Sequence, residues 1–135
     1  MEIELPPQLK GKKASEAFME YVQPFLETLL LDRIAHGINE VPSPKEFEHI
    51  LKIPWLIWNA IVAEKDPKNK IDNLERFKNL TAHLPESTKT IYESLIRRKR
   101  SDFSQYEYYL GKYEIYYDQN NQLRCKAEAI DPNTN

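Results

Sequence analysis

The chain has 135 residues, of which 41% are hydrophobic and 30% are charged, with a formal net charge of −2. This composition is typical of a globular protein and excludes a disordered or low-complexity chain. The length is close to that of one domain, so the sequence predicts a single domain over residues 1–135.

The sequence predicts a cytoplasmic protein without a membrane partner. Cys125 is the only cysteine, so no disulfide can form within the chain. Residues 1–7 are acidic and contain two prolines, whereas a secretory signal needs a basic start and an apolar run. The longest apolar stretch, residues 53–63, is interrupted and too short to cross a bilayer.

The first helix is expected after an extended lead-in over residues 1–13. It begins at Ala14 or Ser15 and stops at Gly37, because glycine is the favoured residue just after a helix. Apolar residues spaced by three and four predict one buried stripe. They are Phe18, Val22, Phe25, Leu26, Leu29, Leu30 and Ile34.

A second helix is indicated by the capping box that runs from Ser43 to Glu46, with a proline at the first helical position. Pro54 ends this helix and begins another turn. Residues 55–62 are apolar almost all round, which predicts the most buried helix of the fold.

Two further helices complete a helical body over residues 14–104. The first carries Leu74, Phe77, Leu80 and Leu84 at helical spacing. The second follows Pro85, carries Ile91, Leu95 and Ile96, and runs into four consecutive cations at residues 97–100. Since two of the helical segments are nearly continuous, the body has four or five helices.

The periodicity then changes to two, which predicts a C-terminal antiparallel β-hairpin within residues 105–130 and hence the α+β class. A three-residue turn with left-handed Asn121 keeps one face apolar. It pairs Tyr117 with Leu123, Ile115 with Cys125, Tyr113 with Ala127, Glu114 with Lys126 and Lys112 with Glu128. Residues 106–110 either prolong the last helix or add a third strand, and 131–135 form a disordered tail.

Charge is uneven along the chain. Residues 65–100 carry 10 basic against 5 acidic residues, and both flanking regions are acidic. The cations at residues 97–100 either contact phosphates or interact with the dipole at the helix C-terminus. Several tyrosines follow shortly after, and tyrosine and arginine are enriched at protein interfaces.

These features favour a non-enzymatic protein-interaction or regulatory module, which binds a partner or itself through the Tyr-rich hairpin and the basic helix end. A hairpin with two free edges can also extend a sheet into another chain. The candidate binding residues are Arg97, Arg98, Lys99, Arg100, Tyr106, Tyr108, Tyr109 and Tyr116. The first alternative is a nucleic-acid-binding accessory protein that uses the same surface, although a pI near 6.0 is low for that class.

The second alternative is an enzyme whose site is assembled from scattered His and Glu residues. His36, His49 and His83 lie in different segments and match no metal-ligand spacing. The three glycines cannot build a phosphate-binding loop, so the sequence predicts no cofactor. Cys125 is predicted on the apolar face of a strand, which favours structural burial over nucleophilic catalysis.

Overall fold

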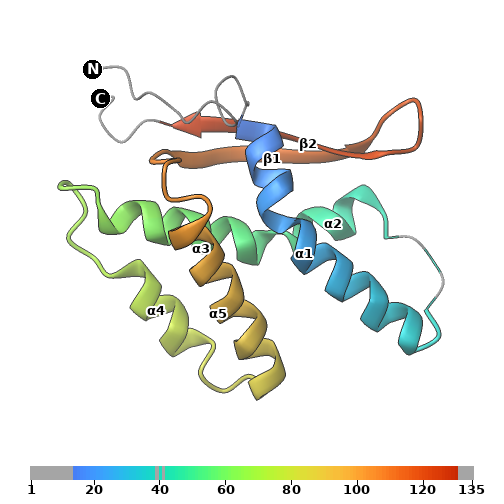
Figure 1. Ribbon diagram of the computed structural model, residues 1–135, viewed down its shortest axis with the longest axis horizontal. Coiled ribbons are helices and arrows are strands. Elements are labelled where there is room, and N and C mark those ends of the chain that lie inside the picture. Colours follow the sequence, from blue (N-terminus) through green and yellow to red (C-terminus); the bar gives the residue numbers. More distant parts are fainter. Residues whose placement is uncertain (1–13, 39, 41, 131–135) are drawn as a thin grey trace.

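The computed structural model describes residues 14–38, 40 and 42–130, and these residues form five helices followed by an antiparallel β-hairpin (Figure 1). The elements are α1 (Ala14–Ala35), α2 (Pro44–Ile50), α3 (Lys52–Glu64), α4 (Asn73–Leu80), α5 (Glu86–Ser101), β1 (Tyr109–Tyr117) and β2 (Leu123–Ile130). The predicted α+β class is confirmed. Only Leu51 separates α2 from α3, so the break expected at Pro54 lies three residues earlier.

The predicted lead-in over residues 1–13 and the predicted tail over 131–135 lie outside the described residues. Of the helices that the structure describes, none is long and apolar enough to cross a membrane.

Side-chain caps begin α2 and α4. The predicted capping box is confirmed, because Ser43 Oγ accepts from the amide of Glu46 at 3.2 Å and the Glu46 carboxylate accepts from the amide of Ser43 at 3.4 Å. At α4, the Asp72 carboxylate accepts from the amide of Glu75 at 2.9 Å. These bonds satisfy amides that would otherwise have no partner in the first turn.

The end of α1 is a Schellman motif centred on Gly37, as the predicted stop requires. Gly37 has a φ of 78°, and its amide donates to the carbonyl of Ile34 at 2.9 Å. The amide of Ile38 donates to the carbonyl of Arg33, also at 2.9 Å. This pair of bonds folds the chain back so that Ile38 lies beside the last turn of the helix.

The hairpin has the predicted register. Ile115 faces Cys125, Glu114 faces Lys126, and the turn places Asn121 at a φ of 59°. The inner face carries the apolar partners, and Cys125 is 7% exposed. Register was therefore set by alternation and by the turn residue, both of which are local features.

The base of the hairpin differs from the prediction. The register shifts between Leu110 and Tyr113, so the expected pair of Lys112 with Glu128 falls in this irregularity and is not among the paired residues. Gly111 sits at the shift, where an added Cβ would come within 2.9 Å of the Ile130 side chain. Residues 109 and 110 lengthen β1, and the part of the chain that the structure describes has two strands and not three.

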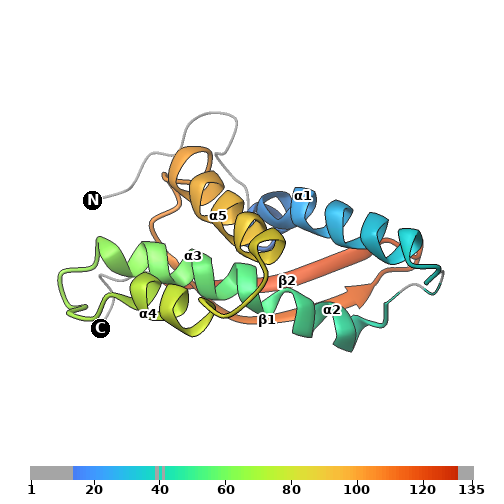
Figure 2. The ribbon, with the colours of Figure 1, turned by 90° about the horizontal axis from the view of Figure 1, so that it is seen from below.

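Helices enclose the hairpin along its inner face and both edges. Figure 2 shows α1 beside β2, whereas α2 and α3 run beside β1. Trp58 of α3 is fully buried at the centre, with ring centroids 5.3 Å from Tyr21 and 5.8 Å from Tyr106. The prediction that residues 55–62 belong to the most buried helix is confirmed, because most of α3 is buried.

Side chains from α2 and α3 occupy the outer edge of β1. Alternate residues of an antiparallel strand point their backbone groups away from the partner strand, where those groups need another partner. Three helix side chains are these hydrogen-bond partners. Glu48 accepts from the amide of Ile115, and Trp55 donates to the carbonyl of Gly111. Asn59 binds both the amide and the carbonyl of Leu110.

The edge of β2 is held by α1. Ser15 Oγ accepts from the amide of Ala127 at 2.9 Å and donates to its carbonyl at 3.4 Å. The expectation of two free edges is therefore wrong at these positions, because helix side chains already hold the backbone groups that an added strand would need.

Two predicted core positions are exposed. Ile34 near the end of α1 is 59% exposed, and Leu80, the last residue of α4, is 73% exposed. The apolar spacing of α1 continues beyond the part of the helix that has a neighbouring helix to pack on. In Figure 1 the C-terminal turns of α1 extend away from α5. The expected helix through Leu84 ends four residues early, at Leu80.

Candidate functional site

The four cations at the end of α5 point to different neighbours. Arg98 donates to two backbone carbonyls of α1 at 3.0 and 2.9 Å, and Arg100 pairs with Glu64 of α3 at 2.6 Å. Lys99 points into the core, and Arg97 is exposed. Successive helix residues are rotated by about 100°, so these cations cannot form the single basic surface that the sequence analysis expected.

The candidate tyrosines are also separated. Tyr106 is fully buried, and Tyr109 donates to Asp66 Oδ2 at 2.7 Å. Tyr108 is half-buried, with a hydroxyl that finds no hydrogen-bond partner among the described residues. Tyr116 lies on the outer face of the hairpin and is 42% exposed. The hairpin therefore presents one candidate tyrosine to solvent and uses the others against the helices.

Lys99 is the most unusual of the candidate residues, because it is a charged side chain only 2% exposed. Its Nζ donates to the carbonyls of Phe103 at 2.7 Å and Tyr106 at 2.9 Å, and lies 4.4 Å from the centre of the Trp58 ring. Burial, and to a lesser extent the nearby charge of Lys65, lower the pKa of this amine from 10.5 to about 8. The two hydrogen bonds from this amine hold the segment between α5 and β1 in place.

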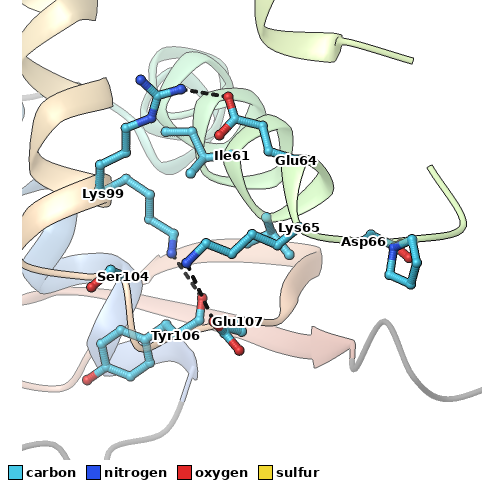
Figure 3. A pocket seen from close by; sticks show the side chains of 11 residues that line it. Ile61, Glu64, Lys65, Asp66, Lys99, Ser104, Tyr106 and Glu107 are labelled. Carbon is cyan, nitrogen blue, oxygen red and sulfur yellow. Dashed lines mark hydrogen bonds and ion pairs between the residues drawn. The ribbon is translucent and has the colours of Figure 1, made fainter. Parts of the chain in front are cut away.

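A cavity of about 270 Å³ opens beside Lys99, between the ends of α3 and α5 and the segment before β1. We call it the Lys99 pocket. Figure 3 shows the amino groups of Lys99 and Lys65 converging there from α5 and from the end of α3. Around Lys99 the polar lining is Glu64, Lys65, Asp66, Arg100, Ser104 and Glu107. Three of the predicted binding residues, Lys99, Arg100 and Tyr106, thus line one pocket.

The charges of the Lys99 pocket are balanced by short ion pairs. Lys65 pairs with Glu107 at 3.5 Å, and Arg100 pairs with Glu64 at 2.6 Å. The hydrogen bond from Tyr109 holds the pKa of Asp66 below its ordinary value. The two ion pairs are partly exposed, so a ligand carrying a charge can exchange with either partner at little cost.

A second candidate surface lies on the last turns of α1. Leu31 is 67% exposed, Ile34 is 59% exposed, and Ile38, folded back by the Schellman motif, is 44% exposed. We call these three residues the α1 patch. Leu31 and Ile34 are three residues apart on the helix, and the Schellman motif returns Ile38 to the side of its last turn.

The residues considered for metal or nucleophilic chemistry lie elsewhere. His36, His49 and His83 are exposed, and none of them lines the Lys99 pocket. Among residues 14–38, 40 and 42–130, no cluster of three or more potential metal ligands occurs. Burial raises the pKa of the Cys125 thiol to about 12, which keeps it protonated at neutral pH.

Several lining residues escaped the sequence analysis. Lys65 and Asp66 follow α3 in a segment that looks like an ordinary break between helices, and Glu107 resembles one of many surface acids. A signal existed for Lys99: it lies four residues after Leu95 and three after Ile96, on the same face as these buried residues.

The chain matches no protein-family model, and no curated protein or solved structure is similar to it.

Proposed function

We propose that this protein is a non-enzymatic protein-interaction module that binds a partner through the α1 patch. The observation that supports this most is the exposure of Leu31, Ile34 and Ile38 together at one helix end. Contiguous exposed apolar residues with polar surroundings are typical of interaction sites. The proposal keeps the function expected from the sequence and moves its surface from the hairpin to α1.

The charges around the α1 patch favour a basic partner. Glu27, Asp32 and Glu40 are exposed near it. Arg33, in the last turn of α1, pairs with Glu46 of α2 at 3.8 Å. A second copy packed symmetrically on the same patch would bring acidic side chains against acidic side chains, which opposes association. We therefore commit to a partner that presents an amphipathic helix with Lys or Arg beside its apolar face.

We also propose that the protein is located in the cytoplasm, as the sequence predicts. The support for this location is the single cysteine, Cys125, which is buried and cannot form an intrachain disulfide.

Binding of a labelled amphipathic peptide built from Leu and Lys tests the proposal. Fluorescence anisotropy should show binding that weakens with salt, as expected for a basic ligand on an acidic rim. The double variant Leu31→Asp with Ile34→Asp should lose at least about tenfold in affinity, since two apolar contacts are replaced by charges.

The matched control is Leu80→Asp, which changes an equally exposed leucine on α4. It should bind the peptide like the wild type, because Leu80 is not part of the α1 patch. Equal losses in both variants, or no binding by the wild type, would overturn the proposal. Light scattering on the free protein tests whether a second copy of the chain covers the α1 patch instead. A dimer that dissociates in Leu31→Asp would replace the basic partner with this second copy.

A further inference from the structure

The Lys99 pocket combines an amine shielded from water with open space beside it. The ammonium of Lys99 has three N–H donors, and two of them are taken by the carbonyls of Phe103 and Tyr106. The side chain is nevertheless one of those that line the cavity. A small molecule in the pocket would therefore meet this amine.

We propose that the Lys99 pocket binds a small oxo acid, an aldehyde or ketone that also carries a carboxylate, and that Lys99 forms an imine with its carbonyl carbon. The inference is independent of the proposed function, because the α1 patch and the Lys99 pocket lie on different residues. It also rests on different observations: the cavity, the buried amine and the paired cations at the rim.

The surroundings of Lys99 favour the nucleophilic form of the amine. An amine attacks a carbonyl carbon only when it is neutral, and lysines are activated by desolvation and by a neighbouring cation. Lys99 has both, since it is 2% exposed and the charge of Lys65 acts on it. With a pKa of about 8, roughly a tenth of the amine is neutral at pH 7.

The reaction balances without an oxidant or reductant. The neutral amine adds to the carbonyl carbon, and the resulting carbinolamine loses its hydroxyl as water. The product is a C=N bond whose nitrogen carries one proton, so one ammonium and one carbonyl compound give one iminium and one water. Glu107, which lines the pocket and acts electrostatically on Lys99, is the group placed to pass the proton between the nitrogen and the departing hydroxyl.

The Trp58 ring that lies against the ammonium also suits the product. The iminium keeps a positive charge at Nζ, over the Trp58 ring, and its single N–H can donate to one of the two carbonyls that the ammonium binds. The burial of a cation is therefore no larger in the product than in the charged reactant.

The rim of the pocket indicates why the ligand should be an acid. Arg100 and Lys65 each hold a carboxylate of the protein, and both pairs are partly exposed. A ligand carboxylate can replace Glu64 on Arg100, because the guanidinium pairs readily with any carboxylate that reaches it. The cavity of about 270 Å³ lies just below the range of about 300–1,000 Å³ usual for drug-sized ligands, which restricts it to small molecules.

Reductive trapping on the full chain tests the inference. The protein is incubated with glyoxylate and cyanoborohydride, and the adducts are located by peptide mass mapping. Lys99 should be modified at least about tenfold faster than Lys112 on the outer face of the hairpin, because its amine is the activated one. Its trapping rate should rise between pH 6.5 and 8.5 as the amine loses its proton.

Two comparisons test the roles of Lys65 and of the ligand carboxylate while Lys99 stays in place. The variant Lys65→Met removes the neighbouring cation, which should raise the pKa of Lys99 and slow trapping at pH 7 several-fold, while Lys112→Met leaves the rate unchanged. Acetaldehyde, which has no carboxylate to pair with Arg100 or Lys65, should show a smaller preference for Lys99 over Lys112 than glyoxylate does. Adducts spread over exposed lysines with Lys99 spared would overturn the inference, and equal preferences for glyoxylate and acetaldehyde would overturn the oxo-acid class.

Discussion

Asn59 of α3 holds both backbone groups of Leu110 in β1: its Oδ1 accepts from the Leu110 amide at 2.7 Å, and its Nδ2 donates to the Leu110 carbonyl at 3.0 Å. One amide side chain thus takes the place of a residue in a neighbouring strand. The arrangement explains why a polar residue stands inside an otherwise apolar helix.

Asn59→Ala should lower the free energy of unfolding by about 2–6 kcal/mol, because it leaves a buried amide and a carbonyl unsatisfied at roughly 1–3 kcal/mol each. Urea denaturation measures the change. Asn79→Ala on the exposed side of α4 is the matched control and should change stability by less than about 0.5 kcal/mol. A similar loss of unfolding free energy in both variants would show that the Asn59 bonds to β1 do not stabilise the fold.

Lys99 should make stability rise with pH relative to a variant that lacks it. The folded amine loses its proton near pH 8, whereas the unfolded amine keeps it up to about pH 10.5. Between these values the unfolded chain binds more protons, so the free energy of unfolding increases with pH by at most about 1.4 kcal/mol per unit.

The measurement is the difference in unfolding free energy between wild type and Lys99→Met at pH 7 and at pH 9.5. Taking the difference cancels the titration of the phenols and of Cys125, which are present in both proteins. Lys112→Met serves as the control, and its stability should follow the wild type at both values. A difference that stays constant with pH would contradict the lowered pKa of Lys99.

Ser15→Ala should loosen the edge of β2 by removing both bonds between the Ser15 hydroxyl and Ala127. We expect a loss of about 1 kcal/mol, the net contribution of a typical hydrogen bond, and faster hydrogen exchange at the Ala127 amide. Ser94→Ala on the exposed face of α5 should leave that amide unchanged. Unchanged exchange at Ala127 in Ser15→Ala would mean that water or other groups protect this edge equally well.

The thiol of Cys125 should react slowly in the folded protein. Burial raises its pKa to about 12, so the thiolate that attacks a disulfide reagent is scarce at pH 8. Reaction with an aromatic disulfide, followed by absorbance, should be at least about a hundredfold slower in buffer than in concentrated urea. Equal rates in the two solvents would show that the thiol is exposed in the native state.

The hairpin could be predicted from the sequence because the residues that determine its register lie close together in the chain. Alternating side chains and one left-handed residue, Asn121, select the register without reference to the rest of the fold. The capping box at Ser43 was predicted for the same reason. Helix capping and hairpin turns depend on residues that lie within a few positions of one another.

The candidate site was harder to predict because it is built from segments that are far apart. The basic run suggested one surface, but the helix rotates Arg98 towards α1 and Arg100 towards α3. The Lys99 pocket joins α3, α5 and the segment before β1, and no local spacing connects Lys65 with Glu107. The burial of Lys99 is predictable from its spacing from Leu95 on one helical face, whereas its charge alone indicates an exposed position.

The bond between Ser15 and Ala127 has a consequence for biosynthesis. These residues are 112 positions apart, so the inner side of the first helix stays without its final partner until almost the whole hairpin has left the ribosome. Phe18 and Tyr21 can pack on Trp58 of α3 earlier, but the side of α1 that lies against β2 faces water until then. Chaperones that recognise apolar segments should therefore meet the nascent protein at α1 and release it when β2 arrives.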